Sequence, residues 1–227
     1  MFGFDGNFLR GIALKGNPYS LAFTESGDLL FRVSLDLLNS RIAHFTENGQ
    51  FVTCIGDEDV KDPLYVSVIS DGKFIINQNT KHVISDKRIK VLTTDGKNSP
   101  RSFKAPDCDE THVCVVYHQE KFFASFSSAC RVVVFNEAGE YIHDIGSEGS
   151  GEGQFSNPTG LAIDKFSRLI VCDAGNKRLQ LFTLEGKYIT QIAGRFFKGG
   201  RPRYAVIYNT GYLFVTDSYR DCVYVFH

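Results

Sequence analysis

A glycine turn recurs along this sequence at a nearly constant period, and this repeat limits the possible folds more than any other feature. The turn glycines follow one another at intervals of 43, 47, 43 and 47 residues: Gly6, Gly49, Gly96, Gly139 and Gly186. Four residues before the last four of them stand bulky apolar side chains: Phe45, Leu92, Phe135 and Phe182. Two markers in constant register predict five copies of one supersecondary unit.

The repeat that contains Gly186 shows what each copy is built from. Short apolar segments alternate there with turns, and they predict strands over 160–164, 168–172, 178–183 and 187–192. The first two strands are rich in Leu, Ile, Ala and Val, whereas the third alternates two leucines with Arg178 and Gln180. We therefore expect burial to fall from the first strand to the last, as in a β-propeller blade whose inner strand lines the axis.

Other positions recur in the same register. A proline precedes the first strand in four repeats: Pro18, Pro63, Pro158 and Pro202. An arginine begins the third strand in four: Arg41, Arg88, Arg131 and Arg178, with Cys222 in its place in the fifth. We expect these arginines to be structural, and to bridge carboxylates that end the second strand, such as Asp173, or to cap carbonyls of the neighbouring blade.

The two ends of the chain predict how the blades are arranged. Residues 8–13 have the pattern of a fourth strand, and residues 223–226 that of a third strand. An N-terminal outer strand paired with the last blade would close the circle and satisfy both sheet edges. The Gly-rich segment 146–153 falls between two blades, so we interpret it as an inter-blade loop. We predict an all-β fold: one β-propeller domain over 1–227, with five four-stranded antiparallel blades.

Composition and charge argue against several classes of function. The chain of 227 residues has a formal net charge of -1, so it lacks the strongly basic field of many nucleic-acid binders. It contains no run of about 18 uncharged apolar residues that would predict a membrane span. Six cysteines lie in or beside apolar strands, where we expect reduced, buried thiols, with disulfides as the alternative. We expect a soluble cytoplasmic chain without a membrane-bound part.

The fourth repeat resembles a known propeller repeat. Residues 146–164, G-S-E-G-S-G-E-G-Q-F-S-N-P-T-G-L-A-I-D, followed by 169–188, L-I-V-C-D-A-G-N-K-R-L-Q-L-F-T-L-E-G-K-Y, are similar to an NHL repeat. This repeat forms the C-terminal propeller of many tripartite-motif (TRIM) ubiquitin ligases. The resemblance covers nearly the whole chain but weakens upstream of this repeat. Domains of that family usually have six blades, whereas this sequence shows five, so either the ring has five blades or one repeat is missing or too divergent to recognise.

The resemblance implies a recognition domain that is not itself an enzyme. In the ligases a RING finger transfers ubiquitin, and this sequence contains no RING, B-box or coiled coil. Some relatives bind single-stranded or hairpin RNA on one propeller face and repress the message, and others bind substrate or motor proteins. The resemblance thus implies a protein partner or ubiquitylation substrate, with RNA as the alternative.

Candidate binding residues come from loops that should emerge on one face, namely those between blades and those between second and third strands. They are Tyr19, Lys81, His82, Asn176, Lys177, Lys198, Arg201, Arg203, Tyr204, Tyr219 and Arg220. Aromatic groups among cations can stack bases and hold phosphates. Acidic side chains such as Glu148 and Glu152 should reach the same face, however, and would repel a polyanion. We therefore place a protein partner first, RNA second, and solvated loop charge as the alternative to any binding role.

A metal-dependent propeller enzyme is the third hypothesis. Such an enzyme gathers carboxylates and histidines around an axial metal, but the expected inner strands offer apolar residues such as Val115, Ile163 and Ala205. The six histidines are scattered and have no metal-ligand spacing. We therefore expect no catalytic residues, no metal and no cofactor.

Overall fold

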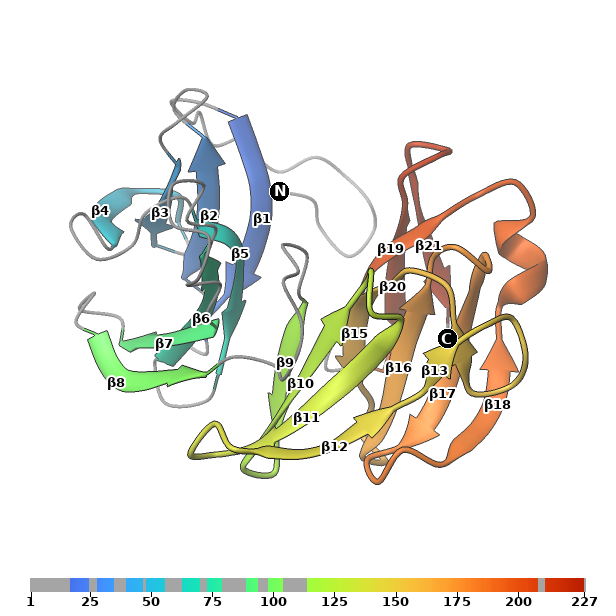
Figure 1. Cartoon of the computed structure of the whole chain (residues 1–227). Helices are drawn as coiled ribbons and strands as arrows, with labels where there is room; N and C mark the ends of the chain where they lie inside the picture. Colours follow the sequence, from blue (N-terminus) through green and yellow to red (C-terminus); the bar gives the residue numbers. More distant parts are fainter. Residues whose placement is uncertain are drawn as a thin grey trace. The chain divides into compact units, whose positions relative to one another are not determined.

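The structure is a computed structural model of the chain (Figure 1). It describes residues 17–24, 28–34, 40–46, 48–55, 63–69, 73–78, 89–93, 98–103, 114–207 and 211–226. The chain divides into two compact units, Met1–Pro100 and Arg101–His227, and each is described by itself below. A single domain over 1–227 therefore stays a prediction.

The N-terminal unit consists of two antiparallel four-stranded sheets in which strands follow one another in chain order. The first blade contains β1 (Asn17–Phe23), β2 (Leu29–Ser34), β3 (Ser40–Phe45) and β4 (Phe51–Ile55). The second contains β5 (Pro63–Val68), β6 (Lys73–Gln78), β7 (Ile89–Thr93) and β8 (Asn98–Phe103), which crosses into the next unit. Leu30 and Ile42 from the first blade pack with Val66 and Ile76 from the second, and these side chains form the core of the unit.

The C-terminal unit repeats this pattern. The third blade contains β9 (Val115–His118), β10 (Lys121–Phe126), β11 (Arg131–Asn136) and β12 (Tyr141–Ile145). The fourth contains β15 (Pro158–Ile163), β16 (Arg168–Asp173), β17 (Arg178–Thr183) and β18 (Tyr188–Ile192). The fifth contains β19 (Pro202–Ile207), β20 (Leu213–Asp217) and β21 (Cys222–Phe226). Between blades lie a short parallel pair, β13 (Ser147–Glu148) with β14 (Gln154–Phe155), and a 3-10 helix, η1 (Gly194–Phe197).

The first strands of these three blades lie side by side, as expected for inner strands. Buried serines of β10 and the turn that follows it join the third blade to the fourth: Ser125 Oγ donates to Thr159 O at 2.5 Å and Ser127 Oγ to Pro158 O at 2.6 Å. Thr159 Oγ1 in turn donates to Pro202 O at 3.3 Å, which joins the fourth blade to the fifth. The described part of the chain contains no α-helix.

The four strands predicted for the fourth repeat are all present, with ends shifted by at most a few residues. The last strand is largely exposed, as expected. The prediction that burial already decreases at the third strand is wrong, because Arg178 is only 8% exposed and Gln180 is fully buried. Both side chains are buried because they belong to a hydrogen-bonded network beneath an inter-blade loop, which is described below.

Phenylalanine fills the interior of a chain that has no tryptophan. The recurring residue four positions before the turn glycine is buried in three blades, as Phe45, Phe135 and Phe182. A second phenylalanine from the preceding segment packs on it: Phe103 lies 4.8 Å from Phe135, and Phe155 lies 5.3 Å from Phe182, between ring centroids. The turns themselves need glycine, since Gly139 and Gly186 adopt φ values of +84° and +89°.

The predicted closure of the circle lies outside the described residues, because 8–13 are not among them. Within the described residues β21 is the last strand of a three-stranded sheet and pairs with β20 alone. No helix in the described residues is both long and apolar enough to span a membrane.

Five cysteines are described, and none of the five is in a disulfide, but they are not all buried. Cys114 and Cys172 are buried, Cys54 and Cys130 are half-buried, and Cys222 is exposed. Burial raises the pKa of the Cys172 thiol far above its ordinary value. The expectation of reduced thiols agrees with these positions, and the expectation of burial fails at Cys222.

An alkylating reagent at mildly alkaline pH should therefore modify Cys222 in the folded protein and leave Cys172 unmodified until the protein unfolds, because only the thiolate reacts. The unfolded Cys172 thiol ionises near about pH 8.5, whereas the folded thiol keeps its proton. Below that pH the Cys172 thiol is protonated in both states, so its contribution to the free energy of unfolding is complete. As the pH rises further, the unfolded thiol loses its proton first, and the free energy of unfolding falls. Peptide mass mapping after native labelling checks this. Modification of Cys172 as fast as Cys222 would contradict it.

Candidate recognition surface

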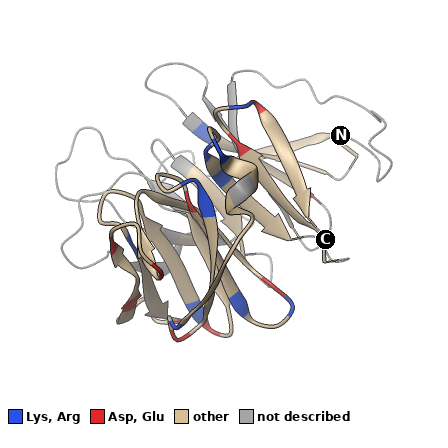
Figure 2. Cartoon of the chain, turned by 90° about the vertical axis from the view of Figure 1, so that its right-hand side faces the viewer, with Lys and Arg blue, Asp and Glu red and all other residues tan. Residues whose placement is uncertain are grey.

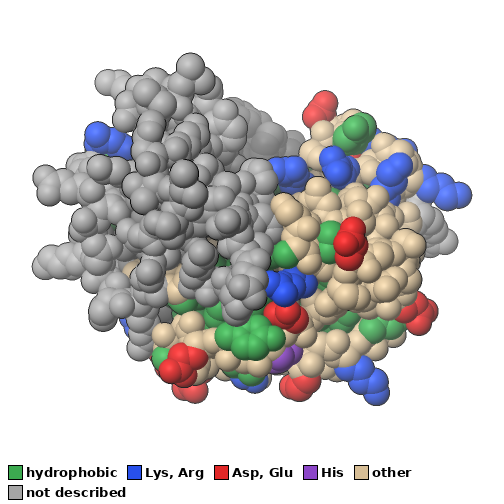
Figure 3. All heavy atoms as spheres, viewed as in Figure 1, with side chains coloured by type: hydrophobic (Ala, Val, Ile, Leu, Met, Phe, Trp, Pro, Cys, Tyr) green, Lys and Arg blue, Asp and Glu red, His purple; other side chains and the backbone are tan. Residues whose placement is uncertain are grey.

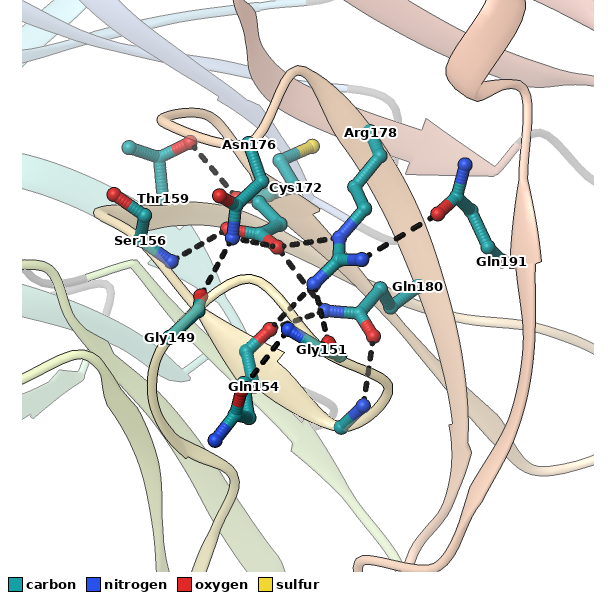
Figure 4. Close-up of polar contacts among 12 residues, drawn as sticks. Gly149, Gly151, Gln154, Ser156, Thr159, Cys172, Asn176, Arg178, Gln180 and Gln191 are labelled. Atoms are coloured by element: carbon teal, nitrogen blue, oxygen red, sulfur yellow. Dashed lines mark hydrogen bonds and ion pairs between the residues drawn. The ribbon is translucent and has the colours of Figure 1, made fainter.

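The fourth blade has a buried polar network centred on the Asp173 carboxylate (Figure 4). Asp173 is fully buried at the end of β16, opposite Arg178 on β17. Arg178 Nε donates to Asp173 Oδ2 at 2.8 Å, and Asn176 Nδ2 and Gln180 Nε2 donate to the same oxygen at 2.9 and 3.1 Å. Asp173 Oδ1 accepts from the backbone N–H of Ser156 at 2.8 Å. The prediction that Arg178 bridges a second-strand carboxylate is confirmed.

The same side chains hold the Gly-rich inter-blade loop 146–153 in place (Figure 4). Arg178 Nη2 donates to Gly151 O at 2.7 Å and to Gln154 O at 2.8 Å, and Asn176 Nδ2 donates to Gly149 O at 2.8 Å. Gln180 adds two further bonds: its Nε2 donates to Gln154 O, and its Oε1 accepts from Gly153 N–H. One buried cluster therefore sets the position of a surface loop.

The recurring arginine has a different acidic partner in the third blade. The position that corresponds to Asp173 is Phe126, and Arg131 Nη1 instead contacts Asp144 Oδ2 on β12 at 3.0 Å. Side chains of this pair are 26% and 29% exposed, against 10% and 0% for Arg178 and Asp173. The pairing is thus preserved, but the carboxylate has moved from the second strand to the fourth.

Asp217 organises the loop of the fifth blade. Its Oδ1 accepts from the backbone N–H groups of Arg201, Tyr219 and Arg220 at 2.8, 3.0 and 3.2 Å. The guanidinium of Arg220 donates to Lys198 O at 2.5 Å, to Phe196 O at 3.4 Å and to Tyr224 Oη at 2.9 Å. The hydrogen bond to Tyr224 raises the pKa of Arg220, so its charge is permanent. The β20–β21 turn and the segment after η1 are therefore held together.

Most of the predicted binding residues of the C-terminal unit lie in or next to the β16–β17 turn, the segment after η1 and the β20–β21 turn. Lys177, Lys198 and Arg220 are exposed, and Arg201 and Arg203 are half-buried. Tyr219 is 72% exposed and Tyr204 is 38% exposed. The Arg203 guanidinium lies 6.0 Å from the centre of the Tyr204 ring. We call the set Lys177, Lys198, Arg201, Arg203, Tyr204, Tyr219 and Arg220 the loop surface.

The remaining predicted residues do not join this set. Asn176 uses its amide to hold the Gly-rich loop, so its role is structural. Tyr19 lies on β1 in the N-terminal unit, and its side chain is outside the described residues, as are Lys81 and His82. One residue that the pattern did not single out is Phe196, which is 41% exposed on η1. The run R-F-F-K at 195–198 contains both Phe196 and the fully buried Phe197, and only the structure distinguishes their roles.

The loop surface carries charge of both signs on its borders. Glu148 and Glu152 are exposed on the Gly-rich loop, which contacts the Asn176 side chain beside Lys177. Figure 2 shows Lys and Arg around η1 and the neighbouring loops, and Figure 3 shows acidic side chains among the cations on the C-terminal unit.

Among the described residues no group of three or more His, Cys, Asp or Glu side chains could hold a metal ion.

The fold class is a β-propeller, and comparisons with known proteins agree with the geometry. A family described as a 6-bladed beta-propeller matches residues 109–198, which is less than half of the chain. Among solved structures, virginiamycin B lyase from Staphylococcus aureus superposes with a TM-score of 0.66 at 15% identity, covering 94% of this chain and 70% of that one. A nidogen/laminin complex gives a TM-score of 0.72 at 16% identity, covering 93% and 76%. These likenesses show the fold alone.

Relatives in sequence include a monooxygenase and two proteins of another kind. Peptidyl-glycine alpha-amidating monooxygenase of Mus musculus is 29% identical over 169 residues, which is 69% of this chain and 17% of that protein. Protein lin-41 of Caenorhabditis elegans is 40% identical over 50 residues, 22% of this chain and 4% of that protein. Protein brain tumor of Drosophila melanogaster is 33% identical over 81 residues, 34% and 8% respectively. The chain thus spans less than a fifth of the length of each relative.

The expectation that this chain is not an enzyme is contradicted by these comparisons. One relative, similar over 69% of this chain, is a monooxygenase, and a propeller of the same fold is a lyase. The expectation was based on the resemblance to NHL repeats and on apolar inner strands, and neither separates a recognition propeller from one that belongs to an enzyme. The NHL resemblance itself is supported in part, by the similarity to lin-41 and brain tumor.

Proposed function

We propose that this chain is a recognition propeller that binds a protein partner through the loop surface. The observation that carries the proposal is the arrangement of exposed tyrosines among cations beside an acidic loop. Tyr219 and Tyr204 offer aromatic area, and Arg203 offers a planar group stacked near a ring. Tyrosine and arginine are the residue types that contribute most to binding at protein interfaces.

The charge pattern favours a protein over RNA. A nucleic acid that followed the cations of the loop surface would meet the Gly-rich loop, which carries the exposed Glu148 and Glu152 and is hydrogen-bonded to Asn176 and Arg178. A polypeptide can place a basic group against the glutamates and acidic groups against Lys198 and Arg203. The chain as a whole has a net charge of -1, which adds no long-range attraction for phosphate.

The wider assignment is a propeller of the TRIM-NHL type that presents a ubiquitylation substrate or scaffolds a partner. Its support is the NHL-like sequence of the fourth repeat and the similarity to lin-41 and brain tumor. We also propose a cytoplasmic location, which the free thiols of Cys130, Cys172 and Cys222 support.

Reversing charge on the loop surface should weaken partner capture. We expect the double variant Lys198→Glu/Arg203→Glu and the single variant Tyr219→Ala each to bind roughly tenfold or more weakly, since loss of one such anchor costs about 2 kcal/mol. The measurement is affinity capture from cell extract followed by titration of the captured partner. The matched control is Lys165→Glu/Lys187→Glu, two exposed lysines on turns at the opposite ends of the strands.

The same experiment distinguishes RNA from protein. RNA would be the ligand if nuclease treatment abolished capture. The logarithm of the binding constant would then also fall with the logarithm of the salt concentration, with a slope of about -0.7 per phosphate contact. That result would contradict the proposal in favour of the alternative. Equal loss of capture in the control variant would mean that binding does not use the loop surface.

A further inference from the structure

Aromatic rings from η1 and β21 pack together at the outer side of the fifth blade. The two neighbouring phenylalanines of η1 differ in burial, since Phe197 is fully buried and Phe196 is 41% exposed. The Phe196 ring meets the Phe226 ring edge-on, with 5.4 Å between centroids, and its centroid lies 6.4 Å from that of Tyr224. Tyr224 and Phe226 are half-buried and pack on the core of the fourth and fifth blades. We call Phe196, Tyr224 and Phe226 the aromatic shelf.

The core position of this segment is filled without Phe196. In the fourth blade Phe155, from the segment before the first strand, is buried against the hairpin residue Phe182. Phe197 has the same role in the fifth blade, because it is fully buried and its ring centroid lies 6.3 Å from that of Phe226. Phe196 is therefore an additional ring, and a large part of its surface faces water.

The backbone around Phe196 is held by several hydrogen bonds. The Phe196 N–H donates to Ala193 O at 3.0 Å, and Phe196 O accepts from the Arg220 guanidinium at 3.4 Å. Arg220 also donates to Lys198 O and, within the aromatic shelf, to Tyr224 Oη. A group that is already positioned loses less conformational freedom when a partner binds, so the Phe196 ring is suited to be an anchor.

Cations border the aromatic shelf. Lys198 follows η1 directly, and both Lys198 and Arg220 are exposed. Segments 194–204 and 218–226 contain a single acidic residue, Asp221, and five basic residues, namely Arg195, Lys198, Arg201, Arg203 and Arg220. Charge complementarity therefore favours a partner segment that carries carboxylates.

We propose that the aromatic shelf binds an acidic segment of the protein partner, with an aromatic side chain of that segment packed against Phe196. Edge-on contacts between rings are favourable, and the carboxylates would be attracted to Lys198 and Arg220. This inference rests on the proposed function and adds the chemistry of the partner. Phe166 also has cations beside its ring, but it has no contact with another ring among the described residues, so it offers no shelf.

The absence of tryptophan from this chain gives a local reporter, because an introduced tryptophan is then the only one. The probe is the synthetic peptide G-D-E-F-E-D-G with blocked ends. Titration of the Phe196→Trp variant with this peptide should change the tryptophan emission in a saturable way. Binding should be roughly tenfold weaker for the peptide with alanine in place of phenylalanine, since an aromatic anchor is lost. A peptide with lysines in place of its acidic residues should not bind.

Phe51 is the matched control for a structural role of Phe196. It is 59% exposed, and it too packs edge-on against a hairpin phenylalanine, Phe45, at 5.5 Å between centroids. Its neighbours in sequence, Gln50 and Val52, are uncharged. Phe196→Ala should weaken capture of the partner roughly tenfold, whereas Phe51→Ala should leave capture unchanged. Equal effects of the two substitutions would mean that Phe196 acts only through packing, and would overturn the proposal.

The peptide titration can overturn the proposal in three further ways. These are no saturable response of the Phe196→Trp variant, equal binding of the alanine peptide, and an equal response of a Phe166→Trp variant, which would indicate unspecific attraction to a ring beside cations. The proposed function can fail separately. If Tyr219→Ala weakens capture and Phe196→Ala does not, the loop surface binds the partner without the aromatic shelf. If neither variant weakens capture, the proposed function fails as well.

Discussion

Replacing Arg178 with methionine is expected to lower the free energy of unfolding by about 3–5 kcal/mol. Methionine keeps most of the apolar volume but leaves the fully buried Asp173 carboxylate without its counter-charge. The substitution also removes the bonds from Nη2 to Gly151 O and Gln154 O that hold the Gly-rich loop. Urea denaturation followed by circular dichroism measures the loss. Native-state hydrogen exchange should in addition show faster exchange in 146–153.

The third blade supplies a matched control for this prediction. Arg131 occupies the same repeat position, but it and its partner Asp144 are each more than a quarter exposed. Arg131→Met should therefore cost less than Arg178→Met, about 1–3 kcal/mol, because water reaches part of the Asp144 carboxylate that loses its partner. Equal losses in the two variants would mean that burial of the Asp173 network does not set its contribution, contrary to the structure.

Replacing Phe155 with alanine should be of similar severity, with a loss of about 3–5 kcal/mol. Phe155 is fully buried, lies 5.3 Å from Phe182 between ring centroids, and ends the Gly-rich loop. A Cβ atom at Gly146 would lie 2.2 Å from the Phe155 ring, so the loop backbone packs directly on it. The cavity left by alanine therefore removes core packing and the support of the loop together.

Phe166 is the control for this second prediction. It is 66% exposed on the β15–β16 turn, where Lys165 and Arg168 lie over its ring at 5.2 and 5.0 Å. Phe166→Ala should change stability by no more than about 0.5 kcal/mol. The comparison uses the same denaturation measurement. A loss at Phe166 as large as at Phe155 would contradict the burial that the structure assigns to these two rings.

The repeat made most of the fold predictable. Turn glycines and the phenylalanines four residues before them made the strand order predictable, because a left-handed turn and a buried ring are local requirements that recur in the first, third and fourth blades. The bridge between Arg178 and Asp173 followed from their register across β16 and β17. Local sequence could not show that Gln180 is buried, because two of its partners, Gln154 O and the Gly153 N–H, lie 26 and 27 residues away in the chain.

The candidate site was predictable only in part. Loop residues near 198–204 and 219–220 could be assigned to one side of the blades from the topology alone, and the structure brings them together through Arg220 and Asp217. Which of two adjacent phenylalanines faces solvent at 196–197 depends on how η1 packs, and the pattern does not contain that information. The prediction about enzymatic activity failed because fold and repeat type do not determine function.

The most direct test of the account is a hydrogen-exchange footprint of the captured partner on the wild-type chain. We predict slower amide exchange in 194–204 and 217–221, the segments that carry most of the loop surface, with little change in 165–168 and 185–187 at the opposite ends of the strands. Protection confined to those opposite turns, or no protection of 194–204, would show that the partner binds elsewhere and would contradict the proposed recognition surface.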